Sequence, residues 1–440
     1  MYLERSVDRA LLEWRNAERF KPLLLRGIRQ CGKTSAVRRL AESFDGYIEL
    51  NFERQPGLKK LFEGDIDVAE ILKMMELQFG KRIQEGKTLL FMDEIQECPR
   101  AITALRYFYE EIPGLHVIAA GSLLEFVLNG KEKKRVDFPV GRVRSIYMYP
   151  FSFREFLTGI GEGNLADYLQ ALDPRQEECL VHEKLLEAYK TFLIVGGMPE
   201  AVSEYVSTGS LLACQQIHRD IVLNFLDDFN KYGSAVPAEM IRKVFSYAMH
   251  NVCSQTKASS AIAGVSAYYF DECVQLLRCA GLVYPVKASD CMSIPLGASE
   301  KETNKKLLVF DTGVYLTERG LNVGDLLAAD VFQDMNRGSV VEMETGLELI
   351  KSQSHYENAE LHYWYKSGAN AEIDYAIVRN GAIIPIEVKA SSKGSMQSMH
   401  AFLKSHERSP YGIRVSLENF AEYENIRVFP VYAVNKIADS

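Results

Sequence analysis

The sequence predicts an α/β protein in three parts: an N-terminal parallel sheet, a helical middle and a C-terminal α/β domain. Strand and helix patterns alternate over the first part, which is typical of βαβ units and a parallel sheet. Helical periodicity then dominates, and strands return after a last helix near the C-terminus. We therefore expect domains at residues 1–150, 151–330 and 331–440.

The composition is ordinary for a soluble globular protein. Hydrophobic residues make up 47% and charged residues 25% of the chain. The net charge of -8 argues against a uniformly basic nucleic-acid coat but is compatible with a local basic face. The eight cysteines lack zinc spacing, which indicates free thiols in a reducing compartment. With no signal peptide or spanning segment visible, we expect a cytoplasmic protein without a membrane partner.

Four apolar segments of the first part are predicted strands, and three periodic segments are predicted helices. The expected strands are Lys21–Leu25, Tyr47–Phe52, Thr88–Met92 and Val117–Ala120. The expected helices are Lys33–Phe44, Ile66–Phe79 and Ala101–Glu111.

A phosphate-binding loop joins the first strand to the first helix. Its glycines let the backbone point N–H groups at phosphate oxygens, and the helix adds the positive end of its dipole. Lys33 is expected to reach the β- and γ-phosphates, and Thr34 to ligate Mg²⁺. We predict that ATP contacts Gly27, Ile28, Arg29, Gln30, Cys31, Gly32, Lys33, Thr34 and Ser35.

Two acids, Asp93 and Glu94, end the third predicted strand. Alone they are more often a solvated strand end, but about 60 residues after a P-loop they indicate a second nucleotide element. Asp93 is expected to hold the Mg²⁺ shell, and Glu94 to orient or deprotonate the attacking water.

Two further residues have weaker signals. Ser122 follows the next strand, where it is either a γ-phosphate sensor or a helix N-cap. Arg142 ends a basic loop and is either an arginine finger, in cis or in trans, or a surface arginine.

The middle part resembles a winged helix in its element order. Three short helices are expected within Met240–Leu282, the third being Tyr268–Cys279. The wing strands are expected at Leu282–Val286 and Lys306–Phe310. With the Lys305-Lys306 pair close by, this order predicts that DNA is a partner.

In the last part, Asn380-Gly381 is a strong signal for a two-residue hairpin loop. Such a loop places Asp374 directly opposite Glu387, and Glu372 opposite Lys389, on one face. Opposed carboxylates fit a divalent metal held by Asp374 and Glu387, beside a catalytic Lys389.

This Asp…Glu-x-Lys hairpin is the pattern of the PD-(D/E)XK nuclease core. The preceding helix offers Glu342 or Glu348 as a further ligand. The alternative is an exposed charged face with a cross-strand salt bridge from Glu372 to Lys389.

In combination, these motifs resemble the prokaryotic AAA-type ATPases that carry a C-terminal domain of unknown function, DUF4143-like, with a restriction-endonuclease-like core. The resemblance spans nearly the whole chain. It also rests on two segments of the middle part, Pro150-Phe151-Ser152-Phe153-Arg154-Glu155-Phe156 and Gly196-Gly197-Met198-Pro199-Glu200. It implies an ASCE-type P-loop NTPase domain in which Glu94 is the catalytic glutamate, and a winged-helix-like middle.

The leading hypothesis is an ATPase that couples its nucleotide state to DNA binding or processing. A second is a non-enzymatic switch in which ATP orders a scaffold. A third is a nuclease-like core that only binds. An oligomer is compatible with each of them.

Overall fold

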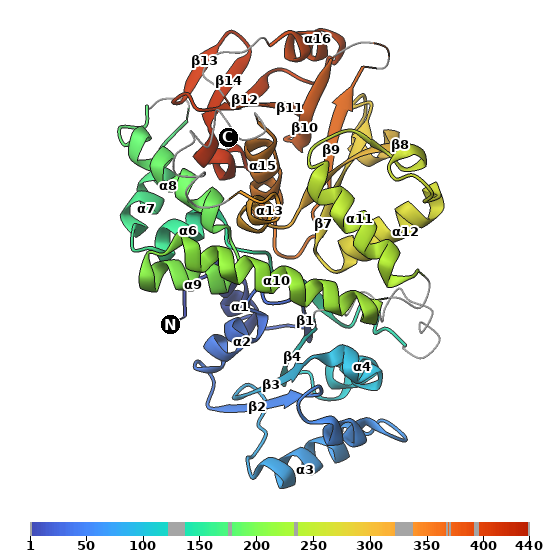
Figure 1. Cartoon of the computed structure of the whole chain (residues 1–440). Coiled ribbons are helices and arrows are strands. Elements are labelled where there is room, and N and C mark those ends of the chain that lie inside the picture. Colours follow the sequence, from blue (N-terminus) through green and yellow to red (C-terminus); the bar gives the residue numbers. More distant parts are fainter. Residues whose placement is uncertain are drawn as a thin grey trace.

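The structure is a computed structural model that describes residues 2–121, 137–174, 178–232, 236–321, 338–366, 368, 371–390 and 396–438. These residues form a five-stranded sheet near the N-terminus and a nine-stranded sheet towards the C-terminus. The long helix α10 (Leu211–Tyr232) runs across the front of the molecule, at a height between the two sheets (Figure 1). No helix in these ranges combines the length and the apolar composition needed to cross a membrane.

The N-terminal sheet is wholly parallel, with the strand order β2-β3-β4-β1-β5. All four predicted strands and all three predicted helices are present, with shifted ends. The strands are β1 (Leu23–Arg26), β2 (Gly46–Asn51), β3 (Thr88–Asp93), β4 (His116–Ala120) and β5 (Arg144–Tyr147). The helices are α1 (Ser6–Arg15), α2 (Lys33–Ala41), α3 (Val68–Phe79) and α4 (Pro99–Glu111), with the 3₁₀ turns η1 (Pro56–Phe62) and η2 (Ile95–Glu97).

Continuous apolar strands form because both faces of this sheet are covered. Leu23 and Leu25 of β1 share a core with α1 and α2, whereas Leu24 belongs to the core under α3 and α4. Successive side chains of a strand point to opposite faces, so each apolar strand serves two cores.

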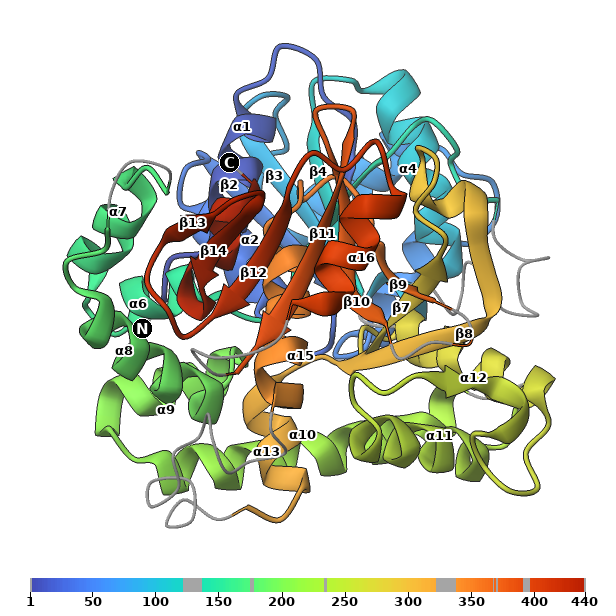
Figure 2. The same ribbon diagram turned by 90° about the horizontal axis from the view of Figure 1, so that it is seen from above.

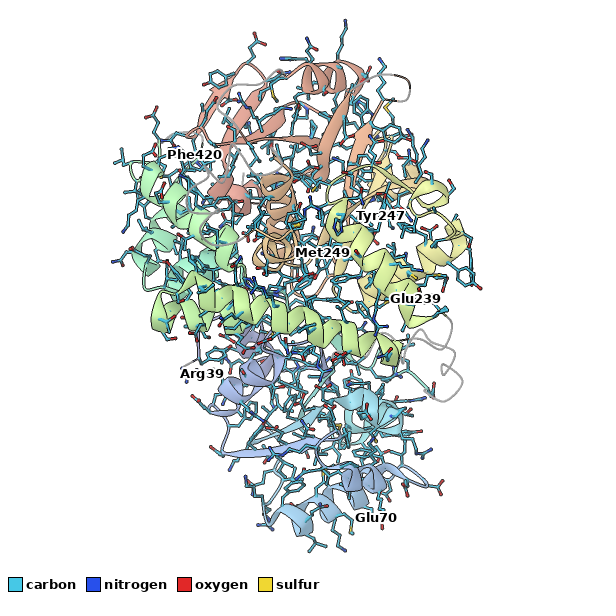
Figure 3. All side chains as sticks on the ribbon, viewed as in Figure 1. Arg39, Glu70, Glu239, Tyr247, Met249 and Phe420 are labelled. Carbon is cyan, nitrogen blue, oxygen red and sulfur yellow. The ribbon has the colours of Figure 1, made fainter. Side chains whose placement is uncertain are left out.

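The middle part begins with helices, as predicted. They are α6 (Phe153–Gly159), α7 (Gly163–Ala171), α8 (His182–Val195), α9 (Pro199–Thr208), α10, α11 (Ala238–His250), α12 (Ala267–Cys279) and α13 (Thr312–Glu318). Tyr247 and Met249 of α11, labelled in Figure 3, pack in this lobe, and the Tyr247 ring meets Phe270 of α12 edge-on. Gly196-Gly197 separates α8 from α9. A Cβ on Gly197 would lie 2.4 Å from the Phe151 carbonyl oxygen, so a larger residue does not fit there.

Where three short helices were expected, the structure has two α-helices, α11 and α12. Between α11 and α12 lie the short strand β6 (Thr256–Lys257) and the 3₁₀ turn η4 (Ala258–Ser260). The expected wing strands are β7 (Val283–Ser289) and β8 (Glu300–Val309), joined by a segment that contains η5 (Leu296–Ser299), and they pair antiparallel.

The C-terminal strands continue the sheet of this hairpin. The order is β13-β14-β12-β11-β10-β9-β7-β8-β6, with β7 parallel to β9. An isolated hairpin edge exposes unpaired N–H and C=O groups, and β9 satisfies those of β7. The expected boundary at residue 330 therefore separates segments that share one sheet.

Helices cover both faces of this large sheet (Figure 2). Tyr363 of β9 packs in the core that holds α15, and its neighbour Trp364 packs with α16. The elements of this part are α15 (Ser339–Lys351), β9 (Leu361–Tyr365), β10 (Glu372–Arg379), β11 (Ala382–Lys389), α16 (Gln397–Ser405), β12 (Gly412–Ser416), β13 (Ala421–Tyr423), β14 (Ile426–Pro430) and η7 (Val431–Ala438).

Candidate functional site

The predicted phosphate loop has the backbone that anion binding requires. Gly27 has a φ of 148°, and a Cβ there would lie 2.2 Å from the Met148 carbonyl oxygen. Gly32 is left-handed at the N-cap of α2, where no side chain caps the helix. The first N–H groups of α2 are therefore available to a phosphate, at the positive end of the helix dipole.

Lys33 is held inside this loop. Its Nζ donates to the carbonyl oxygens of Gly27 at 3.0 Å and Ile28 at 2.9 Å. The side chain is buried, and in this position its ammonium is kept at the centre of the loop by the loop's own backbone.

Thr34 and Asp93, which are distant in sequence, meet beneath the first turn of α2. The Thr34 hydroxyl donates to Asp93 Oδ2 at 3.1 Å. The amide of Asn51, at the end of β2, donates to the same oxygen at 3.2 Å. Burial and the adjacent Glu94 carboxylate raise the pKa of Asp93. A hydroxyl and a carboxylate that converge in this way fit the ligands that Mg²⁺ takes in P-loop sites.

Glu94 has a strained backbone and a fixed side chain. Its φ is 50°, a left-handed conformation that is uncommon for glutamate and concentrates at functional sites. Gln96 Nε2 donates to Glu94 Oε2 at 2.6 Å. A Cβ on Gly121, at the end of β4, would lie 2.2 Å from Gln96 Oε1, so the glycine leaves room for this amide. Gln96 therefore holds the Glu94 carboxylate in a fixed position.

The two weaker predictions differ in outcome. Ser122 lies outside the described residues. The guanidinium of Arg142 donates to Glu110 at the end of α4 at 2.8 Å and is partly exposed. Within one chain, the structure thus brings Arg142 to Glu110, as the surface alternative expects.

Two contacts join the loop to the middle part. Arg29 pairs with the buried carboxylate of Asp228 on α10 at 2.5 Å. A Cβ on Gly281, after α12, would lie 3.2 Å from Ile28 Cβ. Beside these contacts is a cavity of about 240 Å³, whose lining includes Gly27, Gly121 and Arg278 of α12.

Arg5 links the loop to α6. It donates to the carbonyl oxygens of Cys31 at 3.2 Å and Tyr149 at 2.7 Å, and to Glu155 Oε1 at 3.2 Å. Its guanidinium also stacks on Phe151, 3.9 Å from the ring centroid.

Sequence reasoning missed four of these residues: Asn51, Gln96, Arg5 and Asp228. Asn51 had a detectable signal, because it is a polar residue next to the end of a strand predicted in the same sheet. Arg5 and Asp228 lie far along the chain from their partners, and nothing in their local sequence marks them.

The C-terminal hairpin has the predicted register. Asn380 and Gly381 both have positive φ, as a type I′ turn requires, and Arg379 pairs with Ala382. Pairing continues to Tyr375 and Ile386, the residues next to Asp374 and Glu387.

A lysine lies among the predicted metal ligands. Lys306 of β8 is 1% exposed, and its Nζ lies 2.8 Å from Glu342, 3.2 Å from Asp374, and in contact with Glu372. Lys389 pairs with Glu387 at 2.7 Å. Burial and Asp374 raise the pKa of Glu342 to about 8. Burial lowers the pKa of Lys306, but the three carboxylates together hold it well above its ordinary value.

Of the two glutamates of α15 that the sequence offered as ligands, Glu342 reaches this centre. Glu348 instead accepts the Phe153 N–H at 3.0 Å and pairs with Lys351 at 3.4 Å. The DNA-facing role expected of the lysine pair is wrong on this geometry, because Lys305 pairs with Asp271 and Lys306 is buried.

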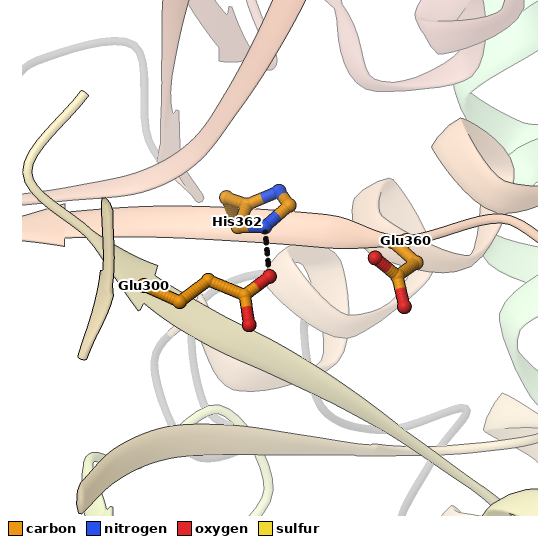
Figure 4. A group of neighbouring side chains, drawn as sticks. All are labelled: Glu300, Glu360 and His362. Atoms are coloured by element: carbon orange, nitrogen blue, oxygen red, sulfur yellow. Dashed lines mark hydrogen bonds and ion pairs between the residues drawn. The ribbon is translucent and has the colours of Figure 1, made fainter. Parts of the chain in front are cut away.

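A second cluster contains Glu300, Glu360 and His362 (Figure 4). His362 Nε2 and Glu300 Oε1 lie 2.8 Å apart. Lys287 Nζ is 3.1 Å from Glu300 and 3.4 Å from Glu360, so a protein ammonium already neutralises these acids.

Three family models match successive parts of the chain. Residues 19–157 match a model described as an AAA domain. The N-terminal part is therefore similar to AAA domains. Residues 186–325 match a domain of unknown function, DUF8612, and residues 337–434 match another, DUF4143. The AAA domain match contains the P-loop, Asp93 and Glu94, and the DUF4143 match contains the carboxylate hairpin.

Solved structures resemble the chain only distantly. The Walker-type ATPase PABY2304 of Pyrococcus abyssi is 14% identical, covering 72% of this chain and 96% of that one, with a TM-score of 0.44. The ORC1 protein of Aeropyrum pernix in complex with DNA is 13% identical, covering 74% and 94%, with a TM-score of 0.31. No curated protein matches this sequence significantly.

Proposed function

We propose that this chain binds and hydrolyses ATP with Mg²⁺ at the P-loop of its AAA domain. The observation that carries this proposal is the 3.1 Å contact between Thr34 and Asp93, beside Glu94 and beneath the uncapped start of α2. Thr34 and Asp93 would hold Mg²⁺, which when bound neutralises charge on the phosphate oxygens.

The other residues take distinct roles. Lys33 leaves the carbonyl oxygens of Gly27 and Ile28 and pairs with the terminal phosphates. Glu94, oriented by Gln96, accepts a proton from the attacking water. Arg142 is the proposed arginine finger. Since its own chain pairs it with Glu110, it would have to act in trans, on the site of a neighbouring copy in an oligomer.

We also propose that the nucleotide state is passed to the middle part and to DNA. The Arg29–Asp228 ion pair supports the first step, since it joins the P-loop directly to α10. The order of α11, β6, α12, β7 and β8, with β8 between β6 and β7, supports a winged-helix DNA site. Tyr268 and Tyr269 are exposed at the start of α12, where such a site would begin.

A non-enzymatic ATP-dependent switch is the second candidate, and the same Arg29–Asp228 contact favours it. The test is phosphate release from Mg·ATP by the parent and by Glu94→Gln, each with no DNA, with duplex and with single-stranded DNA. Turnover that Glu94→Gln abolishes supports the enzyme, and stimulation by DNA supports coupling. Tight ATP binding by the parent without turnover in any condition would refute the ATPase and leave the switch.

A further inference from the structure

The carboxylate centre of the C-terminal sheet joins three elements around one lysine. Glu342 comes from α15, Glu372 and Asp374 from β10, and Lys306 from β8. Lys306 contacts all three carboxylates, and its ammonium also lies 5.3 Å from the ring centroid of Tyr363. A buried ammonium is tolerated only where partners such as these replace its lost hydration.

The remaining oxygens of the expected metal pair are almost fully used. Asp374 directs Oδ1 to Lys306 and accepts the Val388 N–H on Oδ2 at 2.8 Å. Glu387 pairs through Oε1 with Lys389. Among the described residues, Glu387 Oε2 is buried without a partner, and it is the one oxygen of this pair left for another ligand.

These contacts do not fit a divalent metal bridging Asp374 and Glu387. Mg²⁺ and Ca²⁺ require oxygen ligands at short range on several sides. Both Asp374 oxygens are engaged, and the space between Asp374, Glu342 and Glu372 is taken by Lys306.

We propose that the Lys306 ammonium is the resident cation of this centre, in the place where a nuclease-like core would hold a divalent metal. The centre then acts as an ionic joint that fastens the β7–β8 hairpin and α15 to β10. Lys287 of β7 is placed in the same manner among Glu300 and Glu360, so the hairpin supplies an ammonium to two acidic clusters of the sheet.

The test measures the binding of Mn²⁺ alone to the full chain in the absence of nucleotide. The readout is the electron paramagnetic resonance signal of free Mn²⁺, which falls as Mn²⁺ binds. We expect Asp374→Asn to leave Mn²⁺ binding by the parent unchanged. Lys306→Met frees the three carboxylates and should create a new Mn²⁺ site. The affinity of this variant for Mn²⁺ should be at least about tenfold higher than that of the parent. Adding Asp374→Asn to that variant should remove the new site. Lys305→Met is the matched control, because Lys305 immediately precedes Lys306 on β8 and pairs with Asp271. This variant should gain no Mn²⁺ site.

Two results would overturn the proposal. One is a Mn²⁺ site in the parent that Asp374→Asn removes. The other is a folded Lys306→Met protein, with parental circular dichroism, that gains no Mn²⁺ site. If Lys306→Met does not fold, the comparison of the parent with Asp374→Asn still decides.

Discussion

Glu155 is a buried carboxylate in the first turn of α6, and Glu155→Gln should cost substantial stability. Its oxygens accept from Arg5 Nε at 3.2 Å, from the Ser6 N–H at 2.6 Å and hydroxyl at 2.8 Å, and from the Ser152 N–H at 2.8 Å and hydroxyl at 3.2 Å. Burial opposes the charged form, but Arg5 and these donors together lower its pKa from 4.5 to about 2.

This lowered pKa gives the contribution of Glu155 to the free energy of unfolding and the direction in which that contribution changes with pH. One pKa unit corresponds to about 1.4 kcal/mol, so the charged Glu155 contributes about 3 kcal/mol to the free energy of unfolding at neutral pH. Because the pKa of the folded state is lower than that of the unfolded state, the contribution is complete above pH 4.5. It is lost as the pH falls from there towards 2.

The assay uses urea unfolding followed by Trp14 fluorescence. The chain has 2 tryptophans, so Trp364→Phe leaves Trp14, buried in α1, the helix whose first residue Ser6 donates to Glu155, as the single reporter. Glu155→Gln should lower the free energy of unfolding by about 3 kcal/mol at pH 7 and by about 1 kcal/mol less at pH 3.5. The control Glu162→Gln, which breaks a partly exposed pair with Lys184, should cost at most about 0.5 kcal/mol. A loss for Glu155→Gln no larger than that of the control, or equal at both pH values, would refute the reasoning.

Three predictions concern the nucleotide site. Lys33→Ala should abolish tight ATP binding in an equilibrium titration, and undiminished affinity would contradict the P-loop assignment. Glu94→Gln should still bind Mg·ATP but hydrolyse it about 10²–10⁴-fold more slowly, as loss of a general base does; turnover at the parental rate would place the base elsewhere. Asp228→Asn should weaken ATP binding about fivefold, or by about 1 kcal/mol, because Arg29 is partly exposed and its ion pair is screened. The adjacent, exposed Asp227→Asn is its control, and an equal effect there would mean that only the surface charge matters.

The sequence alone was sufficient for features that local patterns encode. The P-loop, its strand and helix, and the pairing of Arg379 with Ala382 all follow from short segments. Such features can be predicted without the fold because they act over a few residues: glycines at forced conformations, short apolar runs and an Asn-Gly turn. The meeting of Thr34 with Asp93 also followed, because parallel strands bring their carboxyl ends to one edge of a sheet.

Only the tertiary structure decided which charges meet. The hairpin pattern gave the register as far as Tyr375 and Ile386, yet it gave no sign that Lys306, about seventy residues before Asp374, enters between Asp374 and its neighbours. The same is true of Asp228 beside Arg29, and of Arg5 beside Glu155. A buried charge takes whichever opposite charge the packing of distant elements brings within reach, and that choice depends on burial, which no local pattern specifies.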